Sequence, residues 1–163
     1  MQVKNKELHR ITSTALIYKD KKYLIARRAS YKKVFPGKWC VPGGGLEVDD
    51  YINIPKTTKD LWYFAIEKSL RREIKEEVNL EVGKLKYLLD IVHITPNFPA
   101  IILSFYCSYK SGRVKLNKEN DKYVWVTYEQ AKKYDFVDGM LEEIEMVDRI
   151  LKGENEDDIK YRC

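Results

Sequence analysis

The chain has 163 residues, of which 44% are hydrophobic and 34% are charged. This length and composition predict one globular domain with a substantial core, and no apolar run approaches the roughly 18 residues of a membrane helix. The net charge of +5 favours an anionic ligand, but lysines and acids are interspersed without a basic stripe. We therefore expect neither a nucleic-acid polymer nor a membrane as a partner.

Cysteine usage indicates the compartment. Cys40, Cys107 and Cys163 are odd in number and contain no Cys-x-x-Cys pair, and the first residues lack the apolar core of a signal peptide. This pattern predicts reduced thiols in a cytoplasmic protein, not a disulfide framework or a zinc site.

Two strands are predicted early in the chain, at residues 9–18 and 22–28, because both segments are rich in β-forming residues and flank a short polar turn. The loop that follows combines basic and aromatic side chains. Such a combination suits the binding of phosphates and the stacking of a base, and a surface loop with one buried aromatic is the alternative. The candidate substrate-binding residues of this region are Arg27, Arg28, Lys33, Phe35 and Trp39.

Residues 38–47 place three successive glycines, Gly43 to Gly45, after a short apolar strand. Glycines at such a position either take a positive φ or allow a close approach of the backbone. Carbonyls exposed there can ligate a hard cation, and amides can hold phosphate. A glycine segment alone is a weak indicator of function, and a helix with clustered acids after it is a much stronger one.

Such a helix is predicted from about Leu61 to Leu80, with Thr58 or Asp60 as its N-cap. Apolar residues recur along it at helical spacing and should form one buried face. They are Ile66, Leu70, Ile74 and Val78.

Three carboxylates, Glu73, Glu76 and Glu77, gather at the rim of this apolar face. Their charges repel one another, and desolvation beside apolar side chains increases the repulsion. A divalent cation would relieve it, and oxygen ligands of this kind suit magnesium or manganese. The alternative is a solvated helix whose acids are offset by neighbouring arginines and lysines.

The rest of the chain alternates strands with helices. Strands are predicted at residues 85–94, 100–109 and 122–126, and helices at 128–134 and 138–151. Together with the earlier elements they indicate a mixed sheet packed between helices, an α/β (α+β) fold. We interpret residues 1–152 as a single domain and residues 153–163 as a mobile tail.

Pro42-Gly43-Gly44 followed by Arg-Glu-Ile-Lys-Glu-Glu-Val-Asn-Leu at residues 72–80 resembles the Nudix box, G-x5-E-x7-R-E-U-x-E-E-x-G-U with U apolar. The preceding Gly-Lys-Trp-Cys-Val-Pro-Gly-Gly is also typical of the strand that enters the box. This resemblance implies a Nudix-type α/β/α sandwich with a mixed β-sheet.

The chain departs from the box in its spacing. Gly44 and Arg72 are 28 positions apart, where the box has 14, and we assign the excess to residues 48–59 as a lid or specificity loop. Counting back from Arg72 places Phe64 at the first box glutamate, so that this carboxylate is missing or is supplied by Asp60 or Glu67.

The late glycine of the box is Asn79 here. This change is tolerable, because asparagine also accepts a left-handed backbone.

The resemblance implies roles for the box residues. Glu76 and Glu77 would be the principal metal ligands together with the main-chain carbonyl of Gly43, and Mg²⁺ would be the cofactor, with Mn²⁺ as a substitute. Glu73 would be a further ligand or the general base, and Arg72 would orient it. Two residues complete the expected site, Gly44 as a substrate-binding residue and Glu119 as a second candidate base.

The expected activity is Mg²⁺-dependent hydrolysis of the pyrophosphate bond in a nucleoside diphosphate linked to another group. Pro96, 16 residues beyond Leu80, favours ADP-ribose or another nucleoside diphosphate sugar, because members that hydrolyse ADP-ribose often carry a proline there. One alternative is a MutT-like enzyme acting on nucleoside triphosphates. The other is a Nudix-fold module that senses a nucleotide without cleaving it. The expected partner is a small nucleotide, and a homodimer is left open.

Overall fold

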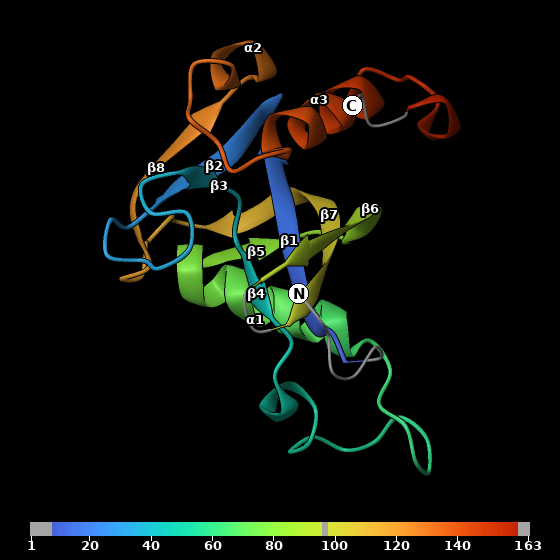
Figure 1. The fold of residues 1–163 in the computed structure, drawn as a ribbon. Coiled ribbons are helices and arrows are strands. Elements are labelled where there is room, and N and C mark those ends of the chain that lie inside the picture. Colours follow the sequence, from blue (N-terminus) through green and yellow to red (C-terminus); the bar gives the residue numbers. More distant parts are fainter. Residues whose placement is uncertain (1–7, 96–97, 160–163) are drawn as a thin grey trace.

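The computed structural model describes residues 8–95 and 98–159. The strands of this part form one sheet (Figure 1). They are β1 (Arg10–Lys19), β2 (Lys22–Arg28), β3 (Trp39–Cys40), β4 (Gly43–Gly45), β5 (Leu80–Val82), β6 (Lys86–Ile94), β7 (Pro99–Gly112) and β8 (Asn120–Val126). The helices are α1 (Ala65–Val78), α2 (Tyr128–Ala131) and α3 (Met140–Leu151), with short 3-10 helices η1 (Val48–Asp50) and η2 (Glu156–Asp158).

A parallel pair, β1 and β7, forms the centre of the sheet, with Arg10 opposite Ala100 and Tyr18 opposite Ser108. The other pairs are antiparallel: β2 joins β1 and carries β3 and β8, while β7 carries β5 and β6. β4 also pairs antiparallel with β1, with Thr14 opposite Gly43. This pairing places the glycine segment beside the central strand.

Helices cover both faces of the sheet (Figure 1). α1 packs on one face, where its residues Leu70, Ile74 and Val78 join a buried cluster with side chains of β1, β2 and β7. α2 and α3 lie on the opposite face over a second buried cluster. The predicted α/β/α sandwich with a mixed sheet is therefore confirmed.

The N-terminus of α1 differs from the prediction. The helix begins at Ala65, not near Leu61, and the preceding residue, Phe64, has a left-handed backbone with φ 60° and makes no side-chain cap. Neither Thr58 nor Asp60 is the N-cap. The Thr58 hydroxyl instead accepts a hydrogen bond from the Leu61 amide within the loop before the helix, at 3.1 Å.

The glycine segment also has a simpler conformation than its composition suggests. Gly43 to Gly45 form the strand β4, and none of the three has a positive φ. Close approach is the reason for glycine here, since a methyl group on Gly43 would lie 2.2 Å from the Ser13 carbonyl oxygen. At the other end of α1, Asn79 takes the left-handed conformation expected of it, with φ 56°.

Residues 153–159, expected to begin a mobile tail, contact the domain. The Arg149 guanidinium pairs with Glu154 at 2.6 Å, and the Tyr106 hydroxyl donates to Glu156 at 2.8 Å. Ile159 is 7% exposed. In the described part of the chain, no helix is both long and apolar enough to cross a membrane.

Candidate active site

The side chain of Arg72 organises the polar face of α1. Its guanidinium forms a two-point ion pair with Asp50, with Nε–Oδ1 at 2.5 Å and Nη2–Oδ2 at 3.1 Å. The same guanidinium donates to Glu73 at 2.9 Å and to Glu76 at 3.0 Å. Arg72 therefore fixes the carboxyl groups of two of the three predicted box acids.

Asp50 is the acid that the prediction missed. Counting forward from Gly44 by the x5 of the box reaches residue 50, and this aspartate makes the ion pair with Arg72. The assignment of Phe64 to the acid position is therefore wrong, and neither Asp60 nor Glu67 replaces the carboxylate. Glu67 pairs with Arg71 instead, at 2.9 Å.

This register also moves the insertion. With Asp50 in the acid position, residues 65–71 supply the seven positions that precede the box arginine, and the extra residues are 51–64 instead of 48–59. The inserted segment leaves the domain next to the N-terminus of α1 and extends away from the sheet (Figure 1).

Asp50 is held at several points. Its carboxylate accepts a hydrogen bond from the Glu47 amide at 2.8 Å, and its side chain is only 4% exposed. The hydrogen bond from Arg72 is the main reason that the pKa of Asp50 falls to about 2, with smaller contributions from the Glu47 amide and the Ser69 hydroxyl. Asp50 is thus ionised at neutral pH and paired with Arg72.

Glu73 lies directly against Gly44. A methyl group on Gly44 would lie 2.2 Å from the carboxyl carbon of Glu73, so only glycine leaves room for this side chain. Burial raises the pKa of Glu73, Arg72 opposes this change, and the charges of Glu76 and Glu119 add to it.

Glu77 is the most deeply buried acid of the cluster, 6% exposed. Its Oε2 accepts a hydrogen bond from the Gly43 amide at 3.0 Å. Burial raises the pKa of Glu77 to about 7; the Gly43 amide lowers it, whereas the charges of Glu73 and Glu119 raise it further. In the absence of a bound metal ion, the carboxyl group of Glu77, which lies between the glycine strand and α1, is therefore only half ionised near neutral pH.

The remaining predicted acids lie at the edge of this group. Glu76 is exposed and paired with Arg72. Glu119 comes from the segment before β8, and its charge acts on both Glu73 and Glu77. Lys32 pairs with Glu119 at 3.0 Å. The structure thus brings Glu119, far away in the sequence, to the acids of α1.

The donor chemistry of this cluster fits a hard divalent cation, because Glu73, Glu77 and Glu119 present carboxylate oxygens whose charges disfavour one another. Within residues 8–95 and 98–159, no group of three or more acidic, histidine or cysteine side chains has an arrangement that could hold a metal ion. The main-chain amide of Gly43 donates a hydrogen bond to Glu77, and the role of its carbonyl as a metal ligand stays a prediction.

The predicted substrate-binding residues lie in different environments. Arg28 is near enough for its charge to lower the pKa of Glu77, and its Nε donates to the Val34 carbonyl at 2.9 Å. Arg27 is instead bound to Asp121 at 2.7 Å. Trp39 packs edge-on against Tyr134, with ring centroids 4.9 Å apart. Of these three side chains, Arg28 is the one that adjoins the acid cluster.

The loop between β2 and β3 carries the other candidates. Lys33 and Phe35 are both exposed. The Phe35 ring meets the His93 ring of β6 at a centroid distance of 5.9 Å. In the sheet, β1 and β7 lie between β2 and β6. The loop after β2 must therefore span the central strands for Phe35 to reach His93.

A helix that carries clustered acids, with an arginine holding two of them and a glycine strand beside them in an α/β/α sandwich, is the arrangement of a Nudix-type pyrophosphohydrolase. The sequence model of the NUDIX domain matches residues 8–145. The chain belongs to the Nudix family, and Nudix hydrolases generally use divalent metal ions.

Relatives and solved structures agree with this assignment. Nucleoside triphosphatase NudI of Klebsiella pneumoniae (strain 342) is 31% identical over 138 residues, covering 74% of this chain and 83% of that protein. NudI of Escherichia coli (strain K12) is 32% identical over 131 residues, with the same coverage of both chains.

Two solved structures share the fold at lower identity. The MutT Nudix hydrolase of Burkholderia pseudomallei has a TM-score of 0.67 at 18% identity, covering 85% of this chain and 98% of that one. The Nudix domain of Shewanella oneidensis NrtR, solved with ADP ribose, has a TM-score of 0.64 at 16% identity, covering 89% and 90%.

Proposed function

We propose that this Nudix hydrolase cleaves a phosphoanhydride bond of a nucleoside triphosphate, with Mg²⁺ as its cofactor. The observation that carries the proposal is that the charges of Glu73 and Glu119 both act on the buried carboxyl of Glu77, with Arg28 also acting on Glu77 and Lys32 paired with Glu119. Acids of this kind suit a divalent cation, and the adjacent cations suit the phosphate groups of a nucleotide.

Glu76 and Glu77 are the residues proposed as the principal ligands of the ion, with Gly43 contributing through its main-chain carbonyl, and Glu73 is either a further ligand or the general base. A bound divalent ion neutralises phosphate charge and lowers the pKa of a coordinated water. Mn²⁺ has similar ligand preferences and is the expected substitute.

The side chains of the protein supply orientation and proton transfer. Arg72 holds the carboxyl group of Glu73 through one oxygen, Oε1, at 2.9 Å. Glu73 is the proposed general base, because burial raises its pKa above the ordinary value for a glutamate and so strengthens it as a proton acceptor. Glu119, which is paired with Lys32, is the second candidate base.

The choice of substrate differs from the sequence-based preference for a nucleoside diphosphate sugar. That preference depended on Pro96, which lies outside the described residues. The NudI proteins, which are named nucleoside triphosphatases, match about three quarters of this chain at 31–32% identity. The protein solved with ADP ribose is 16% identical, which supports the fold and not the substrate. A triphosphate therefore becomes the first candidate and ADP-ribose the second.

The test is a parallel assay of canonical and oxidised nucleoside triphosphates, ADP-ribose, nucleoside diphosphate sugars and dinucleoside polyphosphates, with and without Mg²⁺. We expect kcat/KM for a triphosphate to exceed that for ADP-ribose by at least a hundredfold, about 2.7 kcal/mol in transition-state binding. A reversed ratio would return ADP-ribose to first place. Calorimetric binding of a nucleotide without turnover of any substrate would favour the sensing module.

A further inference from the structure

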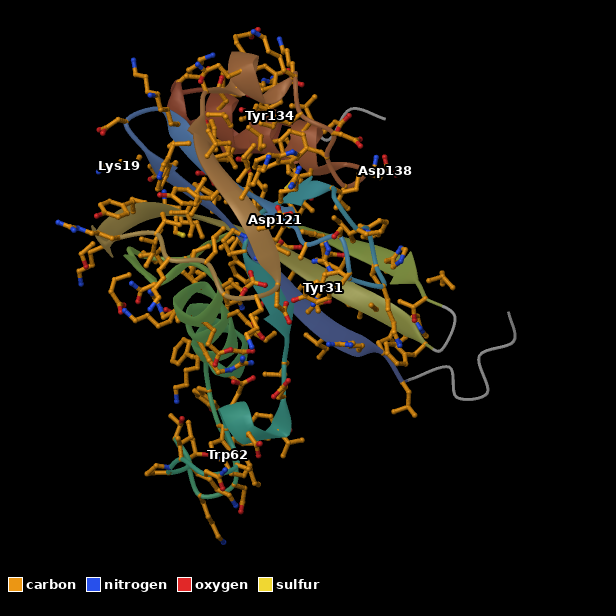
Figure 2. All side chains as sticks on the ribbon, turned by 90° about the vertical axis from the view of Figure 1, so that its left-hand side faces the viewer. Lys19, Tyr31, Trp62, Asp121, Tyr134 and Asp138 are labelled. Carbon is orange, nitrogen blue, oxygen red and sulfur yellow. The ribbon has the colours of Figure 1, made fainter. Side chains whose placement is uncertain are left out.

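The insertion, residues 51–64, lies in the sequence between Asp50 and Arg72, the two partners of an ion pair. Nearly all of its side chains are exposed. Three are not, Tyr51, Ile54 and Trp62, and they mark a small core within the segment. Figures 1 and 2 show the segment extending from the domain, with Trp62 on the extension.

Contacts with Trp62 close this small core. The rings of Tyr51 and Trp62 pack with centroids 5.6 Å apart and an interplanar angle of 56°. The indole Nε1 donates to the Ile54 carbonyl at 2.9 Å, and the Lys56 ammonium lies 5.1 Å from the centroid of the Trp62 ring. A single aromatic side chain thus joins the outgoing part of the insertion to the returning part.

Hydrogen bonds at the tip support the same closure. The Thr57 amide donates to the Leu61 carbonyl at 2.8 Å, and the Tyr63 amide donates to the Thr57 hydroxyl at 3.1 Å. The insertion is therefore a compact loop packed on its own side chains instead of an extended linker.

The closure is adjacent to the residue that holds Arg72. Tyr51 directly follows Asp50 and is the C-cap of η1, the short helix that ends at Asp50. If the insertion were unpacked, Asp50 could move away from Arg72. Ordering a flexible segment costs conformational entropy, and contacts within the segment must offset that cost. Packing of Tyr51 on Trp62 opposes this movement at the point where the insertion begins.

We propose that Tyr51 and Trp62 form a clasp that keeps Asp50 on Arg72, which makes them positioning residues for the acids Glu73 and Glu76. The clasp acts through two contacts that the structure contains, Asp50 to Arg72 and Arg72 to the two glutamates. Its kinetic consequence rests on the proposed hydrolysis, whereas its effect on Arg72 does not depend on any substrate.

The substrate-free test follows the Nε–H signal of Arg72 by NMR, assigned by its loss in Arg72→Lys. Trp62→Ala should shift or broaden this signal, and Trp62→Phe, which keeps an aromatic ring against Tyr51, should largely restore it. Leu61→Ala is the matched control, because Leu61 is a 54% exposed neighbour outside the small core. Equal spectra for Trp62→Ala and Leu61→Ala would overturn the proposal. Tyr51→Leu provides a second variant, tested against the same control, should Trp62→Ala be poorly folded.

The kinetic test uses the best substrate of the parallel assay. Trp62→Ala should lower kcat about tenfold with KM within about twofold, because misplaced catalytic groups reduce turnover more than binding. In an Asp50→Ala background, which removes both oxygens that Arg72 contacts, the same substitution should change kcat less than about twofold, because the contact it protects is already lost. Full additivity of the two substitutions would contradict the clasp. If no substrate is cleaved, the proposed function fails and the NMR result alone decides the inference.

Discussion

Glu77 and Glu143 are two buried carboxylates on opposite faces of the same sheet. Glu77 lies on α1 and is 6% exposed, while Glu143 lies on α3 and is 1% exposed. Burial raises the pKa of each to about 7. In depth and acidity the two side chains are nearly alike.

Their neighbours are different. The charges of Glu73 and Glu119 raise the pKa of Glu77, which accepts a hydrogen bond from the Gly43 amide. The charge of Glu142 raises the pKa of Glu143, which accepts a hydrogen bond from Ser104, and Ser104 in turn contacts Thr14 at 2.9 Å. The comparison teaches that burial alone does not mark the site. The acids that act on Glu77 come from α1 and from the segment before β8, whereas the acid that acts on Glu143 is its own sequence neighbour.

The largest effect should come from removing each carboxylate in turn. Glu77→Gln should lower kcat/KM about a thousandfold, because it removes a proposed metal ligand from a preorganised site. Glu143→Gln should change kcat/KM less than about threefold, since its hydrogen bond to Ser104 can be kept by an amide oxygen. Both variants are assayed with the best substrate and Mg²⁺, and circular dichroism checks their folding. Equal losses in the two variants would remove the functional distinction.

Both Glu77 and Glu143 should contribute to the pH dependence of the free energy of unfolding. Each unfolded carboxyl releases its proton near pH 4.5 and each folded one near pH 7, so between these values the folded state binds more protons and stability falls as pH rises. The loss for each group is about 3 kcal/mol at most and is complete above pH 7. Urea unfolding without metal at pH 5, 6, 7 and 8 measures it. Stability that is independent of pH in this range would show that neither group is perturbed.

Mg²⁺ should cancel the contribution of Glu77 to this pH dependence and leave the contribution of Glu143. At a hundredfold excess over its dissociation constant, the ion should stabilise the wild type and Glu143→Gln by about 2.7 kcal/mol. It should not stabilise Glu77→Gln to the same extent. Thermal melts at pH 7.5 with and without Mg²⁺ provide the comparison, with Ca²⁺ as a second ion. Equal stabilisation of all three proteins would place the ion elsewhere.

A smaller effect should follow from the glycine that supports the neighbouring acid Glu73. Gly44→Ala brings a methyl group against the flexible end of Glu73, so we expect about a tenfold loss in kcat with little change in melting temperature. Gly43→Ala meets the backbone at Ser13 and should instead reduce stability. A large loss of stability in Gly44→Ala would show that Glu73 cannot move away.

The sequence predicted the α1 acids well because helical periodicity places them relative to an apolar face, and the fold followed from the order of the elements. It failed at Asp50, because counting back from Arg72 passes through the insertion; counting forward from Gly44 would have found the residue. β4 was missed because its glycines resemble a turn, and pairing with β1 overrides that preference.

Glu143 was not singled out for a different reason. An acid on an amphipathic helix is ordinarily assigned to solvent, and nothing local in the sequence shows that Ser104, 39 positions away, will cover it. Glu119 was predicted as a candidate base, but its proximity to the α1 acids depends on tertiary structure.

The parallel pairing of β1 with β7 has a consequence for how the protein is made. Ser104 of β7 lies opposite Thr14 of β1, so the centre of the sheet joins segments 90 residues apart. During synthesis, the glycine strand and the acid-bearing helix emerge before β7, the strand that completes their support. Contacts of such high sequence separation fold slowly. We therefore expect Glu119, which follows β7 in the chain, to join the acids of α1 late, after most of the chain has left the ribosome.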